Sequence, residues 1–214
     1  MDQASVKQPS KVLRFFANVF SYVFHPVFMP VAMFVLLYYL SPASFAGHTP
    51  EKFSLDVIQF LLNTVLFPVL VVVLLKALGF IESIKLHDTR DRIIPLIGTM
   101  IFYFWMNQVV KNLNYPLVVH VLTLGCFWGL IGVFMINIFF KISMHTAAAG
   151  GMLGIMMVLM LISKVNMLLP FFIAVVIAGL IGTARLILSA HRPPEIWLGY
   201  IVGFLAQMAA YWYL

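Results

Sequence analysis

The stretch LLPFFIAVVIAGLIGTARLILS, residues 168–189, decides the fold of this chain. It is apolar and has no charged residue before Arg185, close to its end. A helix needs about 20 predominantly apolar residues to cross a membrane. Stretches of the same kind recur along the 214 residues, of which 63% are hydrophobic and 9% are charged. An ordinary soluble domain is about 25% charged, so the composition excludes that class and indicates a membrane protein.

We predict an all-α fold, because lipid offers the backbone no water and the alternating pattern of barrel strands is absent. The expected architecture is a polytopic membrane helix bundle of six to seven transmembrane helices plus an N-terminal interfacial amphipathic helix. The expected spans are residues 26–41, 54–79, 93–110, 117–140, 144–163, 168–189 and 195–213. Residues 1–25 would form a polar segment and a basic helix on the membrane surface, and residues 26–214 the transmembrane domain.

Two further patterns concern the shape and packing of these helices. Pro68, inside the span at 54–79, predicts a kink, since proline removes a backbone hydrogen bond. Two glycine pairs have the four-residue spacing that lets helices approach closely: Gly150 with Gly154, and Gly199 with Gly203. The spacing leaves open whether these pairs meet within one chain or between subunits.

Three polar clusters interrupt the apolar sequence, at residues 85–92, 143–145 and 185–195. When the expected spans are counted along the chain, all three clusters fall on the same side of the membrane as the N-terminus. Ionisable groups are costly next to hydrocarbon, so they are functional candidates by default. Several fixed cations beside titratable imidazoles describe a site for a phosphate that is being transferred.

The third cluster runs from Arg185 through His191 to Glu195. Two prolines before Glu195 end the preceding helix, so that His191 comes from a loop that can fold back. A carboxylate at the start of the next helix can hold one ring nitrogen of His191 and leave the other free to attack. The alternative is structural: Glu195 only complements the helix N-terminus, and Arg192 anchors the membrane interface.

The other two clusters supply a proton donor and more cations. Ser143 is a candidate N-cap whose helix offers exposed backbone N–H groups to an anion, and His145 beside it can protonate a leaving oxygen. Lys85 and Arg92, or Arg90, can reach over a phosphate. Taken alone, each cluster also fits a structural interpretation, a helix cap with an interfacial histidine in one case and a solvated juxtamembrane loop in the other.

A metal site fits these clusters less well than an anion site. His87, His145, His191 and Glu195 are ligand types, but the cations around them would repel a divalent ion. A compact ligand signature such as His-Glu-x-x-His is absent from the sequence. We therefore expect no metal and no cofactor. The remaining histidines are interpreted as structural or solvent-facing: His25, His48 and His120.

Taken together and in this order, the three pieces resemble the type 2 phosphatidic acid phosphatase superfamily of integral membrane phosphatases. That family carries Lys-x6-Arg-Pro, then Pro-Ser-Gly-His, then Ser-Arg-x5-His-x3-Asp. Lys85-x6-Arg92 keeps the first spacing, Ser143-Met144-His145 keeps the serine and histidine of the second motif, and Arg185-x5-His191-x3-Glu195 keeps the third spacing. The resemblance covers roughly residues 54–213, and it would make residues 26–214 a phosphatase-like domain.

The resemblance implies a role for each matching residue. His191 would be the nucleophile that forms a phosphohistidine, Glu195 would orient it, and His145 would be the general acid. The phosphoryl oxygens would be held by Lys85, Arg92, Arg185 and Ser143, with Arg90 and Met144 as further candidates. Departures from the family pattern are Ile93 for proline, Met144 for glycine, Ala184 for serine and Glu195 for aspartate, and two whole spans between the first and second motifs.

The sequence thus predicts an enzyme, a membrane-embedded phosphatase of lipid metabolism. Its substrate would be a lipid phosphomonoester or diphosphate of the phosphatidate, phosphatidylglycerol phosphate or polyprenyl diphosphate class. Two alternatives stay open: a non-catalytic lipid-phosphate binding or transport protein, and a lipid phosphotransferase. The expected partners are the lipid phosphate substrate, membrane lipids and, as a candidate, further copies of the chain, but no nucleic acid.

We expect a multi-pass protein of a cell (inner) membrane, with its N-terminus and active site on one side. Ten of the thirteen Lys and Arg residues fall on that side, which the positive-inside rule assigns to the cytoplasm. Without the five cations in or next to the site, the bias falls to five against three, so the orientation stays open on charge alone.

Overall fold

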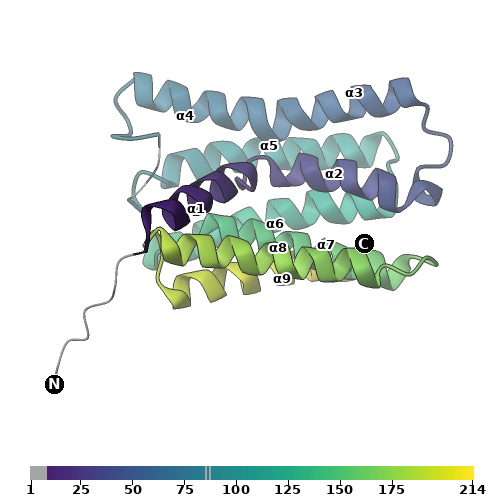
Figure 1. Ribbon diagram of the computed structural model, residues 1–214. Coiled ribbons are helices and arrows are strands. Elements are labelled where there is room, and N and C mark those ends of the chain that lie inside the picture. The colour runs from purple at the N-terminus through teal and green to yellow at the C-terminus, as the bar shows by residue number, and fades with distance from the viewer. Residues whose placement is uncertain (1–8, 85, 87) are drawn as a thin grey trace.

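The computed structural model describes residues 9–84, 86 and 88–214, and this part of the chain is helical with no strand (Figure 1). The helices are α1 (Lys11–Val23), α2 (Met29–Leu40), η1 (Pro42–Phe45), α3 (Pro50–Leu61), η2 (Leu62–Leu66), α4 (Phe67–Ala77), α5 (Ile93–Asn112), α6 (Leu117–Phe139), α7 (Met144–Ile162), α8 (Leu168–Ile187) and α9 (Pro193–Tyr213). They run side by side along one bundle axis, which confirms the all-α fold class.

Five helices are long and apolar enough to cross a membrane: α3–η2–α4 as one continuous helix, α5, α6, α7 and α8. The protein is therefore an integral membrane protein. The first and last of the expected spans are less clear-cut. Helix α2, Met29–Leu40, is apolar but shorter than the other five. Helix α9, Pro193–Tyr213, has the length of a span and carries Glu195 in its first turn.

The expected kink near Pro68 takes the form of a π-helical turn. The turn η2 covers Leu62–Leu66, and Pro68 follows it in the first turn of α4. Proline has no N–H and clashes with the carbonyl four residues back, and a wider turn relieves both constraints within a continuous helix. The residue four positions before Pro68 is Thr64, and its hydroxyl donates a hydrogen bond to the Phe60 carbonyl at 2.8 Å.

The two glycine pairs bring α7 and α9 together within one chain. A side chain at Gly203 would overlap the backbone of Ala147, and one at Gly150 would overlap the backbone of Tyr200. Gly199 likewise faces the first turn of α7. This close packing fixes the start of α9 beside the start of α7, so that the second and third polar clusters meet.

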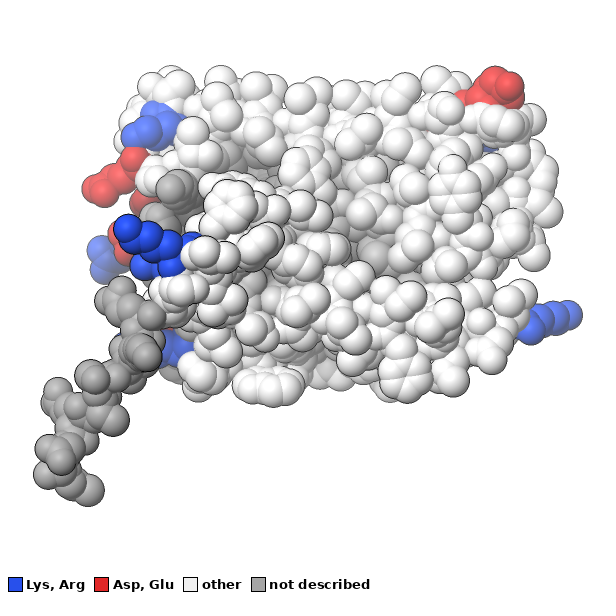
Figure 2. Space-filling view, viewed as in Figure 1, with Lys and Arg blue, Asp and Glu red and all other residues white. Residues whose placement is uncertain are grey.

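Charged side chains gather mainly at one end of the bundle, the end at which α1 begins and α4 finishes (Figure 2). The loops between α4 and α5, α6 and α7, and α8 and α9 all lie at this end. Helix α1 packs there against α8. The candidate site therefore lies at this end, which we call the charged end.

Candidate functional site

His191 and Glu195 form the best-defined pair at the charged end. The carboxylate Oε2 of Glu195 lies 2.7 Å from Nδ1 of His191, and the imidazole side chain is 5% exposed. The chain leaves α8 through Ser189, whose φ of 52° is left-handed, and starts α9 at Pro193. This turn folds His191 back onto the first turn of α9, as the two prolines predicted.

The surroundings keep the His191 ring neutral. Burial lowers the pKa of His191 to about 4, although the hydrogen bond and the charge of Glu195 act in the opposite direction. A neutral ring donates its Nδ1 proton to the carboxylate, so Nε2 keeps its lone pair. In the described part of the chain, Nε2 has no hydrogen-bond partner. The pair thus has the arrangement of an oriented nucleophile.

Ser143 joins α7 to α9 from a fully buried position. Its hydroxyl accepts from the backbone N–H of Thr146 at 3.4 Å, which makes it the N-cap of α7. Its own N–H donates to the Glu195 carbonyl at 3.2 Å. Ser143 is 0% exposed. In this structure its hydroxyl caps α7, and its backbone N–H ties the start of α7 to the first turn of α9, which follows the loop that carries His191.

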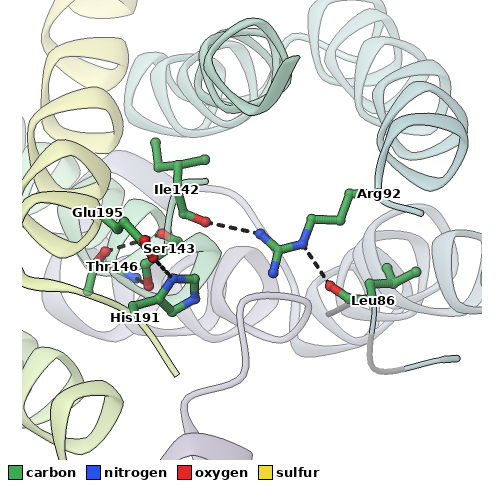
Figure 3. A network of polar contacts seen from close by, with 7 residues as sticks. All are labelled: Leu86, Arg92, Ile142, Ser143, Thr146, His191 and Glu195. Carbon is green, nitrogen blue, oxygen red and sulfur yellow. Dashed lines mark hydrogen bonds and ion pairs between the residues drawn. The ribbon is translucent and has the colours of Figure 1, made fainter. Parts of the chain in front are cut away.

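Arg92 connects the first cluster to the other two (Figure 3). Its guanidinium donates to the Ile142 carbonyl at 3.1 Å and to the Leu86 carbonyl at 2.7 Å. Burial lowers the pKa of Arg92, whereas the charges of Glu195 and Asp88 raise it. Arg92 thus donates to the carbonyl of Ile142, while the carbonyl of Glu195 accepts from the N–H of the next residue, Ser143.

The other predicted cations of the first cluster are Lys85 and Arg90. Lys85 lies outside the described residues, as does His87. Arg90 is exposed at the surface, whereas Arg92 is 5% exposed. Of the cations described in this cluster, Arg92 is the one that the structure brings to the other two clusters.

Helix α1 is part of the site, which the sequence did not predict. Ser21 accepts a hydrogen bond from Arg185 at 3.3 Å through its hydroxyl, and its carbonyl lies 3.2 Å from Nε2 of His145. The ring of His25 meets the ring of His145 edge to face, with centroids 5.3 Å apart. Burial lowers the pKa of His25, and the charge of Arg185 lowers it further. His25 therefore belongs to the site and is not a solvent-facing residue.

A pattern in the sequence could have revealed this contribution. Arg14, Asn18, Ser21 and His25 are spaced four, three and four residues apart, which places them along one face of a helix. All four line the same cavity. The basic amphipathic character of residues 11–24 fits a helix on the membrane surface equally well, so the sequence alone does not assign this polar face to a site.

The cavity has a volume of about 800 Å³, and its lining is polar at the charged end and apolar deeper in the bundle. We call the polar part of the cavity the mouth. Around the mouth are four cations and two imidazoles: Arg14, Arg92, Lys141, Arg185, His25 and His145. The Nε of Arg185 is buried and has no partner in the described part of the chain. An anion at this mouth would meet several cations and would satisfy that donor.

The nucleophile candidate lies next to this cavity and not on its wall. Met144, Arg185 and Ala190 line the cavity, whereas His191, Glu195 and Ser143 do not. The chain thus lines the cavity up to Ala190, the residue before His191. The structure brings His145, Arg92 and Arg185 to one cavity and sets the His191–Glu195 pair one residue behind it.

The cations around the mouth favour an anion as a ligand, because they would attract it and repel a metal ion. Among the described residues there is no group of three or more His, Cys, Asp or Glu side chains that could hold a metal ion.

No family model, no curated protein and no solved structure matches this chain. The resemblance to the type 2 phosphatidic acid phosphatase superfamily stays a prediction that rests on the residues quoted for it.

Proposed function

We propose that the protein is a membrane-embedded lipid phosphate phosphatase that works through a phosphohistidine at His191. The observation that carries the proposal is the 2.7 Å contact between Nδ1 of His191 and Glu195, beside a cavity whose mouth is lined with cations. Such a pair orients an imidazole for attack. Phosphoryl transfer otherwise needs positioning and stabilisation of charge, which the arginines at the mouth supply.

The reaction would proceed in two displacements. Nε2 of His191 attacks phosphorus, the bond from phosphorus to the leaving oxygen breaks, and His145 gives that oxygen a proton. Water then attacks the phosphohistidine and gives a proton to His145, which restores the acid for the next cycle; the N–P bond breaks, and phosphate leaves with the His191 imidazole restored. Because His191 does not line the cavity whereas Ala190 does, attack requires Nε2 to reach the phosphate by a local rearrangement.

The shape of the cavity supports a lipid as the substrate. Behind the cations the lining is apolar and is supplied by α2, α4, α5 and α6, with residues such as Met33, Val72, Leu96 and Val133. A phosphate headgroup would lie at the mouth, and its apolar chain would lie between the helices. The phosphatidate, phosphatidylglycerol phosphate and polyprenyl diphosphate classes all combine these two parts.

The membrane placement follows from the same proposal. Helices α2 and α9 pack against α6 and α7, and with them the chain would cross the membrane seven times. Helix α1 would lie at the interface, where its polar face meets the cavity and its apolar face meets lipid. The excess of cations would place the mouth on the cytoplasmic side of a cell (inner) membrane.

The test is phosphate release from a panel of lipid phosphates by the purified protein in detergent, with a chelator present. We expect release by the unchanged protein and its loss in His191→Ala and in His145→Ala. His120→Ala is the matched control, because His120 lies in the first turn of α6 at the far end of the bundle. If a folded protein binds these lipids but releases no phosphate, the proposal that the protein is a hydrolase is wrong.

One observation favours a second function, a lipid-phosphate binding or transport protein. The cations and His145 line the cavity, but the His191–Glu195 pair does not. A cavity that holds the headgroup without exposing the nucleophile would bind and release the lipid unchanged. Binding that is weakened by Arg185→Gln but unaffected by His191→Ala, without phosphate release, would identify this function. Phosphate recovered on an added alcohol would instead identify a phosphotransferase.

A further inference from the structure

The apolar part of the cavity reaches deep into the bundle. On α5 its wall runs from Arg92 at the mouth to Tyr103. Eleven residues of helix rise about 17 Å. The hydrocarbon core of a membrane is about 30 Å thick, so the inner end of the cavity lies near the middle of the membrane. We call this inner end, formed by Tyr103, Leu122, Cys126 and Gln207, the floor.

The floor contains a buried amide with one unused atom. Gln207 is 1% exposed. Its Nε2 donates to the Leu122 carbonyl at 3.3 Å and lies 3.7 Å from the Cys126 sulfur. Because a carbonyl only accepts hydrogen bonds, this contact identifies which of the two amide atoms is the nitrogen. The oxygen Oε1 is then left buried without a partner in the described part of the chain.

The bundle makes room for this amide with two glycines. A side chain at Gly125 on α6 would overlap the amide of Gln207, and one at Gly154 on α7 would collide with its Cβ. A leucine at position 207 would satisfy an apolar core without any polar atom to bury. A polar side chain inside a membrane is costly and is a functional candidate by default. The packing therefore indicates that the amide has a use at the floor.

A second polar group at the floor also has no partner. Tyr103 is 7% exposed and lines the cavity. Among the described residues, no hydrogen bond involves its hydroxyl, whereas nearby hydroxyls are occupied. Thr64 donates to the Phe60 carbonyl and Thr99 to the Pro95 carbonyl, each at 2.8 Å. Among the described residues, the floor thus holds one unpaired acceptor, the buried Oε1 of Gln207, and one unpaired hydroxyl, on Tyr103.

We propose that the floor is a binding site for a hydroxyl group carried on the apolar chain of the ligand. The ligand hydroxyl donates to Oε1 of Gln207 and accepts from the Tyr103 hydroxyl, so both free groups are satisfied at once. The ligand class is an amphiphile with phosphate at one end and a hydroxyl farther along its chain. The proposal rests on the proposed function only in placing the phosphate at the mouth.

The probes are alkyl phosphates from octyl to hexadecyl and their ω-hydroxy analogues, bound at equilibrium to the full-length protein in lipid nanodiscs. The series places the hydroxyl at successive depths. At the chain length that reaches the floor, we expect the hydroxy analogue to bind about fivefold tighter than the plain chain, the scale of one net hydrogen bond. Shorter analogues should show no such preference.

Three variants separate the floor from the rest of the cavity. Gln207→Leu and the isosteric Tyr103→Phe should each remove the preference for the hydroxy analogue and leave plain chains bound at least as well. Thr99→Val is the matched control and should keep the preference, because the Thr99 hydroxyl already bonds Pro95. Equal binding of both series at every length would overturn the proposal and leave water as the occupant of the floor.

Arg185→Gln tells this proposal apart from the proposed function. If the phosphate lies at the mouth, this variant weakens both series by the same factor and keeps the preference for the hydroxyl. If it leaves both affinities unchanged while the preference persists, the mouth does not bind phosphate, and the floor site stands without it. A preference that survives both Gln207→Leu and Tyr103→Phe would assign it to another part of the cavity and overturn the floor site.

Discussion

The two ends of the bundle both bury polar side chains, but they pair them differently. At the end opposite the charged end, the Tyr115 hydroxyl donates to Asp56 at 2.5 Å, and His48 faces the other carboxylate oxygen at 3.8 Å. Stacked rings surround this cluster, among them Phe34 and Phe60 with centroids 4.0 Å apart. At the charged end, and within the described part of the chain, the Ser21 hydroxyl is the one hydrogen-bond partner of Arg185, whose Nε is left without any.

The difference separates a structural polar cluster from a ligand site. Tyr115, Asp56 and His48 place two donors beside one acid, so that opposite charges and partners meet within the protein, although His48 Nε2 and Asp56 Oδ2 make no hydrogen bond in the described part of the chain. The cations at the cavity mouth face one another and two imidazoles, which is unfavourable unless an anion joins them. Variants at the charged end should therefore change activity more than stability, and variants at the opposite end should do the reverse.

Arg185→Gln should show the largest effect. Loss of this cation removes a donor aimed at the phosphate, and we expect catalytic efficiency on a lipid phosphate to fall on the order of 10²- to 10³-fold. The Tm in detergent should stay the same or rise, because a half-buried cation near Arg92 is gone. A fall in Tm that matches the loss of activity would mean that Arg185 is structural, and the contrast between the two ends would fail.

Glu195→Gln tests the oriented imidazole at the same end. We expect phosphate release to fall about 10- to 100-fold, the scale for removing a carboxylate that orients a functional histidine. His191 attacks in its neutral form, so activity is present above its pKa of about 4 and is lost as the pH falls through that value. Glu195 raises that pKa, so the variant should lose activity at a lower pH.

The pH profile of release, with a variant at an unrelated acid for comparison, checks this expectation. Glu82→Gln serves as the control, because Glu82 is exposed in the loop after α4. An acidic limb that stays in place in Glu195→Gln would show that another group controls it.

Tyr115→Phe should show the opposite pattern at the opposite end. Burial and the hydrogen bond to Asp56 raise the pKa of the Tyr115 phenol, which keeps it a donor. Its removal leaves a buried carboxylate oxygen unpaired, and we expect the free energy of unfolding to fall by about 1–3 kcal/mol. Phosphate release per folded molecule should not change. Denaturant unfolding in detergent, with Tyr39→Phe at an exposed position as the control, measures the difference.

The parts of the structure that local patterns determine were predictable from the sequence. Apolar runs located the five long helices within a few residues. The two prolines before Glu195 predicted the turn that folds His191 back, since that contact spans four residues. The kink near Pro68 was predicted, but its form as a π-helical turn was not, because the choice between a bend and a wider turn depends on neighbouring helices.

Contacts between distant segments were not predictable in the same way. Ser21 meets His145 and Arg185 across 124 and 164 residues of sequence. Its role depends on how α1 docks on α8, which one helix cannot reveal. Gln207 was missed for a related reason. It is a single polar residue in an apolar helix without a motif, and its meaning comes from two glycines on other helices and from the cavity beside it.

Ser21→Ala should show the smallest effect and tests whether α1 competes with the ligand. The Ser21 hydroxyl occupies a donor of Arg185, so a phosphate that binds Arg185 must compete with it for that donor. Without the hydroxyl, we expect KM for a lipid phosphate to fall about two- to fivefold, less than the value of a full hydrogen bond to a charged group. The turnover number should stay the same, because the Ser21 carbonyl still holds His145.

Ser10→Ala, at the N-cap of the same helix, controls for a general loosening of α1. A rise in KM in Ser21→Ala alone would mean that the hydroxyl holds Arg185 in place for the phosphate, and α1 would then be a support of the site and not a competitor for it.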